Sequence, residues 1–220
     1  MKKLLFISLS LSITLLCVFK VDANQLTFPL IGKIIVIDPG HGGKDRGADY
    51  NDIYESELNL AISLELKKAL EKSGATVLMT REDNYDLSSP NVYYRKKNDF
   101  DNRIKLINNS NADLYLSNHL NSILNCKNFG PQVFYDKKIT ENKIIAEMIQ
   151  TELNIALEDT RKIGVLNPNN YYLYKQLNTK GVLIECGFLS NASDRKKLQT
   201  EKHQQKIART INRAIIKYYS

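Results

Sequence analysis

The sequence is poor in the residues that mark several special classes of protein. Its 220 residues include three cysteines, five prolines, ten glycines and no tryptophan. So few cysteines exclude a small fold held together by disulfides, and the low glycine and proline contents exclude collagen-like and low-complexity chains. Hydrophobic residues make up 43% and charged residues 25%, which is typical of a globular chain with one sizeable core. The net charge of +7 suits nucleic acid, an anionic membrane or an anionic wall polymer equally well, so it selects no partner.

The N-terminal segment differs from the rest of the chain. Two lysines precede an apolar run over residues 4–19, and small residues follow it. The run is shorter than the about 20 apolar residues that a membrane span needs, so residues 1–23 are predicted to be a signal peptide. An uncleaved N-terminal membrane anchor is the alternative. Residues 24–220 are then expected to form one domain of an exported protein.

Strands and helices alternate along this domain. Short β-branched runs predict strands, and apolar residues at helical spacing predict the helices between them. This order favours a single-domain α/β fold, with an open, largely parallel (mixed) twisted sheet and helices on both faces. The strands are expected at 33–38, 75–80, 112–118, 132–135 and 181–185, and the helices at 57–73, 93–109, 142–157 and through Ile207 and Tyr218 near the C-terminus.

Two of the three histidines follow predicted strands. His41 comes shortly after the first strand, and His119 comes directly after the third. Binding sites in open α/β sheets gather at the carboxyl ends of strands, so these histidines are expected to lie close together. Glu55 and Glu57 lie near the start of the first helix, where one of them is expected to serve only the helix dipole. Two histidines and one glutamate form a known ligand set for catalytic zinc.

Glu185 stands at the tip of an apolar predicted strand. A carboxylate there is desolvated, which raises its pKa and suits a general base beside a cation. A buried salt bridge to a lysine or arginine is the competing interpretation, and spacing alone does not separate the two. Of the other polar groups, His203 is interpreted as a solvated surface residue, and Cys126 and Cys186 as separate thiols. The tyrosines at 93–94 and 171–174 are interpreted as half-buried edges of the core, with the second group also able to line a groove.

Four segments together resemble one family. Residues 35–48 (IVIDPGHGGKDRGA), 55–60 (ESELNL), 116–121 (LSNHLN) and 183–191 (LIECGFLSN) are similar, in this order, to the motifs of the zinc-dependent N-acetylmuramoyl-L-alanine amidases, the amidase-3 family. The motifs span nearly the whole of residues 24–220. Asn118 and Cys186 depart from the family pattern, which has apolar or aliphatic residues there; both flank the site.

The resemblance implies a site and a reaction. His41, Glu55 and His119 would bind one catalytic zinc ion, and Glu185 would be the catalytic glutamate. Residues 103–109 (RIKLINN) and the single-domain layout resemble the germination-specific branch found in endospore formers. That branch implies removal of stem peptides from spore-cortex peptidoglycan, as the first step of muramic-δ-lactam formation, together with a separate peptidoglycan deacetylase. In some relatives a lipoprotein partner is needed for activity.

Other functions fit parts of the pattern. A zinc peptidase that cuts within the stem peptide would use the same ligands, whereas a non-catalytic wall-binding or scaffold protein would need neither an open metal position nor a base. Nucleic acid is not expected as a partner, because no basic stripe is interleaved with aromatic residues. The resemblance also implies a location in the cell wall or in the space between the forespore membranes.

Overall fold

A computed structural model describes residues 28–123, 128–158, 164–167, 172 and 176–220. Five strands form one sheet in the order β4-β1-β5-β7-β6, and every neighbouring pair is parallel except β6 and β7. The mixed, mostly parallel α/β sheet is therefore confirmed. The strands are β1 (Ile34–Pro39), β4 (Thr76–Met79), β5 (Leu114–Asn121), β6 (Gln132–Tyr135) and β7 (Gly181–Phe188), and a separate small hairpin joins β2 (Asp49–Tyr50) to β3 (Ile53–Tyr54).

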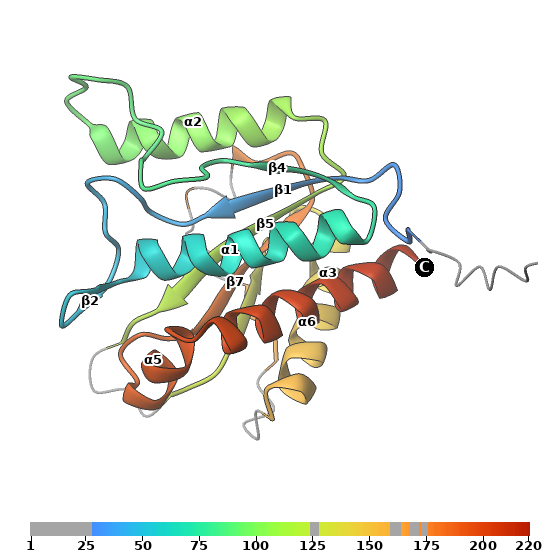
Figure 1. The fold of residues 1–220 in the computed structure, drawn as a ribbon. Helices are drawn as coiled ribbons and strands as arrows, with labels where there is room; N and C mark the ends of the chain where they lie inside the picture. The colour runs from blue at the N-terminus through green and yellow to red at the C-terminus, as the bar shows by residue number, and fades with distance from the viewer. Residues whose placement is uncertain (1–27, 124–127, 159–163, 168–171, 173–175) are drawn as a thin grey trace, which may run out of the picture.

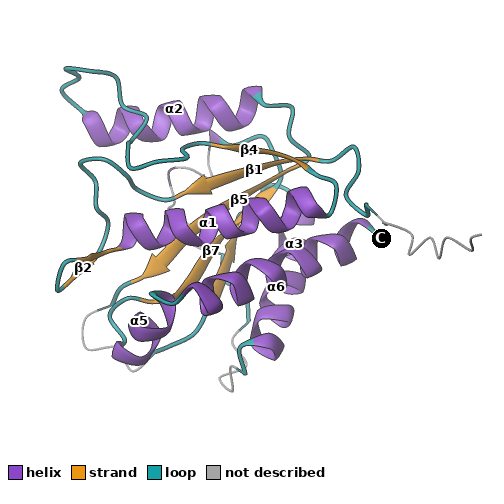
Figure 2. Cartoon of the chain, in the orientation of Figure 1, coloured by secondary structure: helices purple, strands orange, loops and turns teal. Residues whose placement is uncertain are grey.

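Helices cover both faces of the sheet (Figures 1 and 2). On one face α2 packs Ile104 and Ile107 against Val36 and Tyr115 of the sheet. On the other face a larger core lies between the sheet and the helices α1, α3 and α6. Side chains along β1 alternate between these two cores, which explains why its sequence shows no polar face. The helices are α1 (Glu55–Lys72), α2 (Arg95–Asn109), α3 (Thr140–Ala156), α5 (Ala192–Leu198) and α6 (Glu201–Tyr219).

The two central strands are longer than the sequence predicted. Pairing of β1 with β5 ends at Pro39 opposite Asn118, but β5 and β7 continue side by side beyond that point. His119 pairs with Glu185 in this extension, so both residues lie within strands and the predicted strand ends were wrong. The extra residues are held by β5 and β7 pairing with each other, from His119 opposite Glu185 to Asn121 opposite Phe188, a long-range contact that no local pattern reveals. Both side chains nevertheless stand past the end of β1, at the carboxyl edge of the sheet.

His203 is half-buried, so its interpretation as a solvated residue was wrong. It lines a small cavity with Leu198 and Cys186 where α5 meets α6. Burial, assisted by nearby Lys197, lowers its pKa. Cys186 itself is a buried free thiol, as expected. Cys126 lies outside the described residues.

The tyrosine pair before α2 also differs from expectation. Tyr93 and Tyr94 are 90% and 71% exposed and stack edge-to-face on each other, so they are not half-buried core residues. Tyr172 is 41% exposed and touches Phe100 of α2, while Tyr171 and Tyr174 lie outside the described residues. Among the helices that the structure describes, none combines the length and the apolar character that a bilayer crossing requires.

Candidate metal centre

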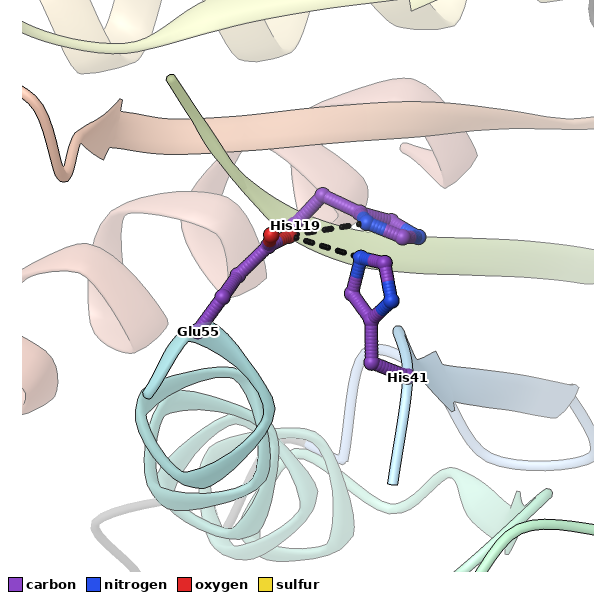
Figure 3. Close-up of side chains that lie close together, drawn as sticks. All are labelled: His41, Glu55 and His119. Carbon is purple, nitrogen blue, oxygen red and sulfur yellow. Dashed lines mark hydrogen bonds and ion pairs between the residues drawn. The ribbon is translucent and has the colours of Figure 1, made fainter. Parts of the chain in front are cut away.

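Three predicted side chains meet at the carboxyl edge of the sheet. His41 comes from the loop after β1, Glu55 from the first turn of α1 and His119 from β5 (Figure 3). His41 Nε2 lies 3.2 Å from Glu55 Oε1, and His119 Nδ1 lies 3.1 Å from the same oxygen. One donor atom from each residue lies within 4.8 Å of the other two. Two imidazole nitrogens and one carboxylate oxygen in this arrangement fit a zinc ion with an open fourth position.

Glu55 is held in place by the backbone around it. Its Oε2 accepts a hydrogen bond from Ala48 N at 2.9 Å, and its Oε1 accepts one from Leu120 N at 3.1 Å. Burial would raise the pKa of this carboxyl, but hydrogen bonds to His119 and His41 outweigh that effect and hold it far below its usual range. Glu57, by contrast, is exposed. Of the two acidic residues in this turn, Glu55 is therefore the one that faces the cluster.

A carboxylate that sequence reasoning missed orients His41. Asp45 Oδ2 lies 3.0 Å from His41 Nδ1, which leaves Nε2 directed at Glu55. Histidine ligands of metals commonly have such a partner on the second ring nitrogen. Burial would lower the pKa of His41, but the hydrogen bonds to Asp45 and Glu55 raise it to about 9. Asp45 belongs to the first motif. Its position four residues after His41 was the feature of the sequence that could have indicated this contact.

Two buried arginines hold the loop that carries His41. His41 has a φ of +62°, a left-handed backbone conformation that is unfavourable for residues other than glycine. Arg103 donates hydrogen bonds to the carbonyl oxygens of Pro39 (2.9 Å) and His41 (2.6 Å). Arg81 donates to those of Pro39 (3.0 Å) and Gly40 (2.9 Å). The carbonyl oxygens of Pro39, Gly40 and His41 therefore each accept a hydrogen bond from a guanidinium group. Apart from the inclusion of Arg103 in a family-like stretch, nothing in the sequence pointed to this role.

Arg103 is itself fixed by two buried carboxylates. Its Nη1 lies 2.7 Å from Asp38 Oδ1 and its Nε lies 2.9 Å from Asp99 Oδ2. Burial would raise the pKa of Asp38, but the charge of Arg103 and hydrogen bonds from Thr80 and Arg103 hold it at about 2. The stability that this pair contributes is therefore present above about pH 4, the usual range of an aspartate, and is lost as the pH falls through about 2.

Glu185 faces the same cavity, which has a volume of about 340 Å³ and is also lined by the three clustered side chains. It is only 7% exposed, and its Oε2 has no hydrogen-bond partner among the described residues. Burial, together with the charge of Glu55, raises its pKa to about 8. Within the described chain no lysine or arginine pairs with it, which favours the proton-transfer interpretation over the salt bridge. An unpaired, desolvated carboxyl of this kind suits proton transfer.

The comparisons with known proteins agree with this geometry. The family model described as N-acetylmuramoyl-L-alanine amidase matches residues 35–217. The chain belongs to this amidase family. A germination-specific N-acetylmuramoyl-L-alanine amidase of Bacillus subtilis is 40% identical, over all of this chain and 96% of that protein.

Solved structures of the family share the fold. The CwlD amidase from Clostridioides difficile, solved in complex with the GerS lipoprotein, has 40% identity and a TM-score of 0.81, over 84% of this chain and 98% of that one. An N-acetylmuramoyl-L-alanine amidase from Clostridium difficile 630 has 32% identity and a TM-score of 0.75, over 84% and 96%. These values confirm the amidase fold.

Asn118 and Cys186, the two residues that depart from the amidase motifs, have side chains directed away from the cavity. Asn118 is fully buried and donates a hydrogen bond to Ser63 Oγ of α1 at 2.9 Å. Cys186 is buried in the core beneath α1, α3 and α6. Neither side chain lines the active-site cavity. Both flank the site along the strands, as expected, but they face the helices.

Gly40 is required by the close approach of His119. A Cβ atom at position 40 would lie 2.2 Å from His119 Cε1, far inside van der Waals contact. We expect Gly40→Ala to displace the imidazole and to weaken zinc binding at least tenfold in a chelator competition assay. Gly32→Ala is the control, since its Cβ meets open space although its φ is +76°. It should cost about 1 kcal/mol of stability and leave zinc affinity as it was. Equal zinc affinity in the Gly40 variant would contradict this packing argument.

Proposed function

We propose that this amidase hydrolyses the bond between N-acetylmuramic acid and L-alanine in peptidoglycan, with one zinc ion held by His41, Glu55 and His119. The observation that supports this most is the pairing of a three-ligand cluster with a buried, unpartnered carboxyl, Glu185, in one open cavity. A binding protein has no need of that carboxyl, because burying it costs free energy without a partner.

In the proposed reaction the residues of the chain have separate roles. A zinc ion bound here would supply Lewis-acid chemistry, polarising the amide carbonyl and making a water more acidic. Glu185 accepts the proton of the attacking water and returns it to the nitrogen of the leaving L-alanine. Asp45 keeps His41 in the tautomer that presents Nε2 to the centre. Arg81 and Arg103 keep the His41 loop from relaxing.

Digestion of purified peptidoglycan by the zinc-loaded full chain tests this function. Release of peptides with a free L-alanine amino group, together with free lactyl carboxylates, is the expected result. Cut peptides on an intact lactyl–alanine bond would instead show the zinc peptidase, and binding without any cleavage would show the wall-binding protein. His119→Ala should abolish stoichiometric zinc, because it removes one of three ligands; emission spectroscopy measures this directly. A full complement of zinc in that variant would contradict the ligand assignment.

The biological setting is proposed from the relatives. A germination-specific relative that matches this chain over its whole length supports removal of stem peptides from spore cortex, which would be the first step of muramic-δ-lactam formation beside a separate deacetylase. The relative solved with a lipoprotein supports a lipoprotein partner for this chain. Residues 1–23 would direct export to the cell wall or to the space between the forespore membranes, by cleavage or as an anchor, and residues 24–220 would form the catalytic domain.

A further inference from the structure

A second cavity, of about 250 Å³, adjoins the candidate metal centre. It shares Asp45 and Asp99 with the lining of the active-site cavity, so the two spaces are direct neighbours. Charged side chains make up its whole lining: Lys44, Asp45, Asp86, Arg95, Lys96 and Asp99. A polar cavity of this kind holds water rather than standing empty, so a ligand that replaces the water must offer charged or polar groups to this lining.

The aspartates of this cavity are already engaged by other groups. Asp45 contacts the His41 ring at 3.0 Å. Asp99 Oδ2 accepts from Arg103 Nε at 2.9 Å, and its Oδ1 accepts from Leu87 N at 2.7 Å.

The third aspartate is engaged in the same way. Asp86 forms an ion pair with Arg95 and accepts a hydrogen bond from Ser88 N at 3.0 Å. The negative charges of the lining, and the one arginine, are therefore held by fixed partners on the protein.

The two lysines are the groups left to face a ligand. Lys96 is exposed, and its Nζ has only a longer contact of 3.5 Å, to Asp45 Oδ2. Lys44 is exposed and has no ion pair within the described part of the chain. Two exposed lysines in the lining of one cavity favour an anion. Because Lys96 contacts Asp45 and Asp45 contacts His41, an anion on Lys96 would lie only one side chain away from a metal ligand.

We propose that Lys44 and Lys96 bind a carboxylate of the stem peptide and thereby select acidic peptides. The proposal rests on the proposed function. On the sugar side of the scissile bond the substrate carries hydroxyl and acetamide groups without charge, so the two available lysines have no counterpart there. On the other side, L-alanine is followed by a γ-linked D-glutamate, whose α-carboxylate is the first charge after the bond. This carboxylate lies close to the scissile bond in the substrate, and Lys96 lies close to the metal ligand His41 through Asp45.

Two substrates that differ only in this group provide the test. The full chain, loaded with zinc, is given N-acetylmuramoyl-L-alanyl-D-glutamate or the same compound with the α-carboxylate amidated. Wild type should show about a tenfold higher kcat/KM for the acid, since a charge-assisted hydrogen bond at a partly exposed site has roughly that effect. Lys44→Met and Lys96→Met should each reduce this preference severalfold, through KM, and the double variant should bring it to about one. Lys96→Arg should retain it.

Matched controls separate the outcomes. Lys137→Met removes another exposed lysine, in the loop between β6 and α3, and should keep the full preference. Equal rates of wild type on acid and amide, or equal losses on both substrates in the lysine variants, would overturn the subsite. If wild type releases no lactyl carboxylate from either compound, the proposed function fails instead. Calorimetric Kd values of both compounds on the Glu185→Gln full chain then decide the subsite separately: tighter binding of the acid supports it, and equal binding refutes it.

Discussion

Glu185→Gln should lower the rate of peptidoglycan hydrolysis by about a thousandfold while the protein keeps one zinc ion per chain. General base catalysis contributes typically between 10² and 10⁴ in rate, and an amide at this position can no longer accept the proton of the attacking water. The substitution is nearly isosteric, and the buried carboxyl has no ion pair to lose within the described chain. Folding and metal binding should therefore remain, which separates the role of Glu185 from that of the three clustered side chains.

Zinc content and turnover must be measured on the same preparation. Glu57→Gln is the matched control, because it makes the same change at an exposed position in the first turn of α1 and should leave both quantities as in wild type. Loss of zinc from the Glu185 variant would make this residue a fourth ligand. Undiminished hydrolysis would remove it from the reaction altogether, and the proton would then need another acceptor in the cavity.

The arrangement of the sheet follows from short-range sequence signals. β-Branched runs and helical spacing located each strand of the main sheet and the four long helices, with ends that differ from the predicted ones by at most three residues. The helix at Glu55 begins two residues early, because Glu55 N and Ser56 N bond to the carbonyls of the Ala48 loop and extend the first turn. That loop returns to the helix only in the folded protein, so no local pattern predicts the contact.

The candidate site, like the fold, was predictable from the sequence only in part. His41, Glu55, His119 and Glu185 were predictable, because each carries a reactive group at the carboxyl edge of an α/β sheet and belongs to a family-like motif. Arg81 and Arg103 were not predictable from position. An arginine in a charged amphipathic helix usually faces solvent, and only the tertiary fold buries Arg103 against a loop more than sixty residues away. The role of Arg103 in holding the His41 loop depends on those long-range contacts.

The second large effect is expected at Arg103. Arg103→Met should destabilise the protein by about 3–5 kcal/mol, because it leaves the buried Asp38 and Asp99 without their cationic partner. It should also weaken zinc binding, since the carbonyl of His41 loses its donor and the left-handed backbone at His41 loses support. Chemical denaturation measures the first quantity, and competition with a chelator at fixed pH measures the second.

Arg103→Lys distinguishes positioning of His41 from stability alone. A lysine keeps the positive charge near Asp38, but its single nitrogen cannot occupy the positions of both Nη1 and Nη2, from which the planar guanidinium donates to the Pro39 and His41 carbonyls. We expect zinc affinity to fall about tenfold or more, as when outer partners of metal ligands are removed, with a smaller loss of stability than in the methionine variant. Arg213→Lys, which alters a surface pair with Glu152, is the control and should change neither quantity appreciably. If zinc affinity in Arg103→Lys equals that of wild type, the His41 loop holds its conformation without the guanidinium, and Arg103 stabilises the fold only.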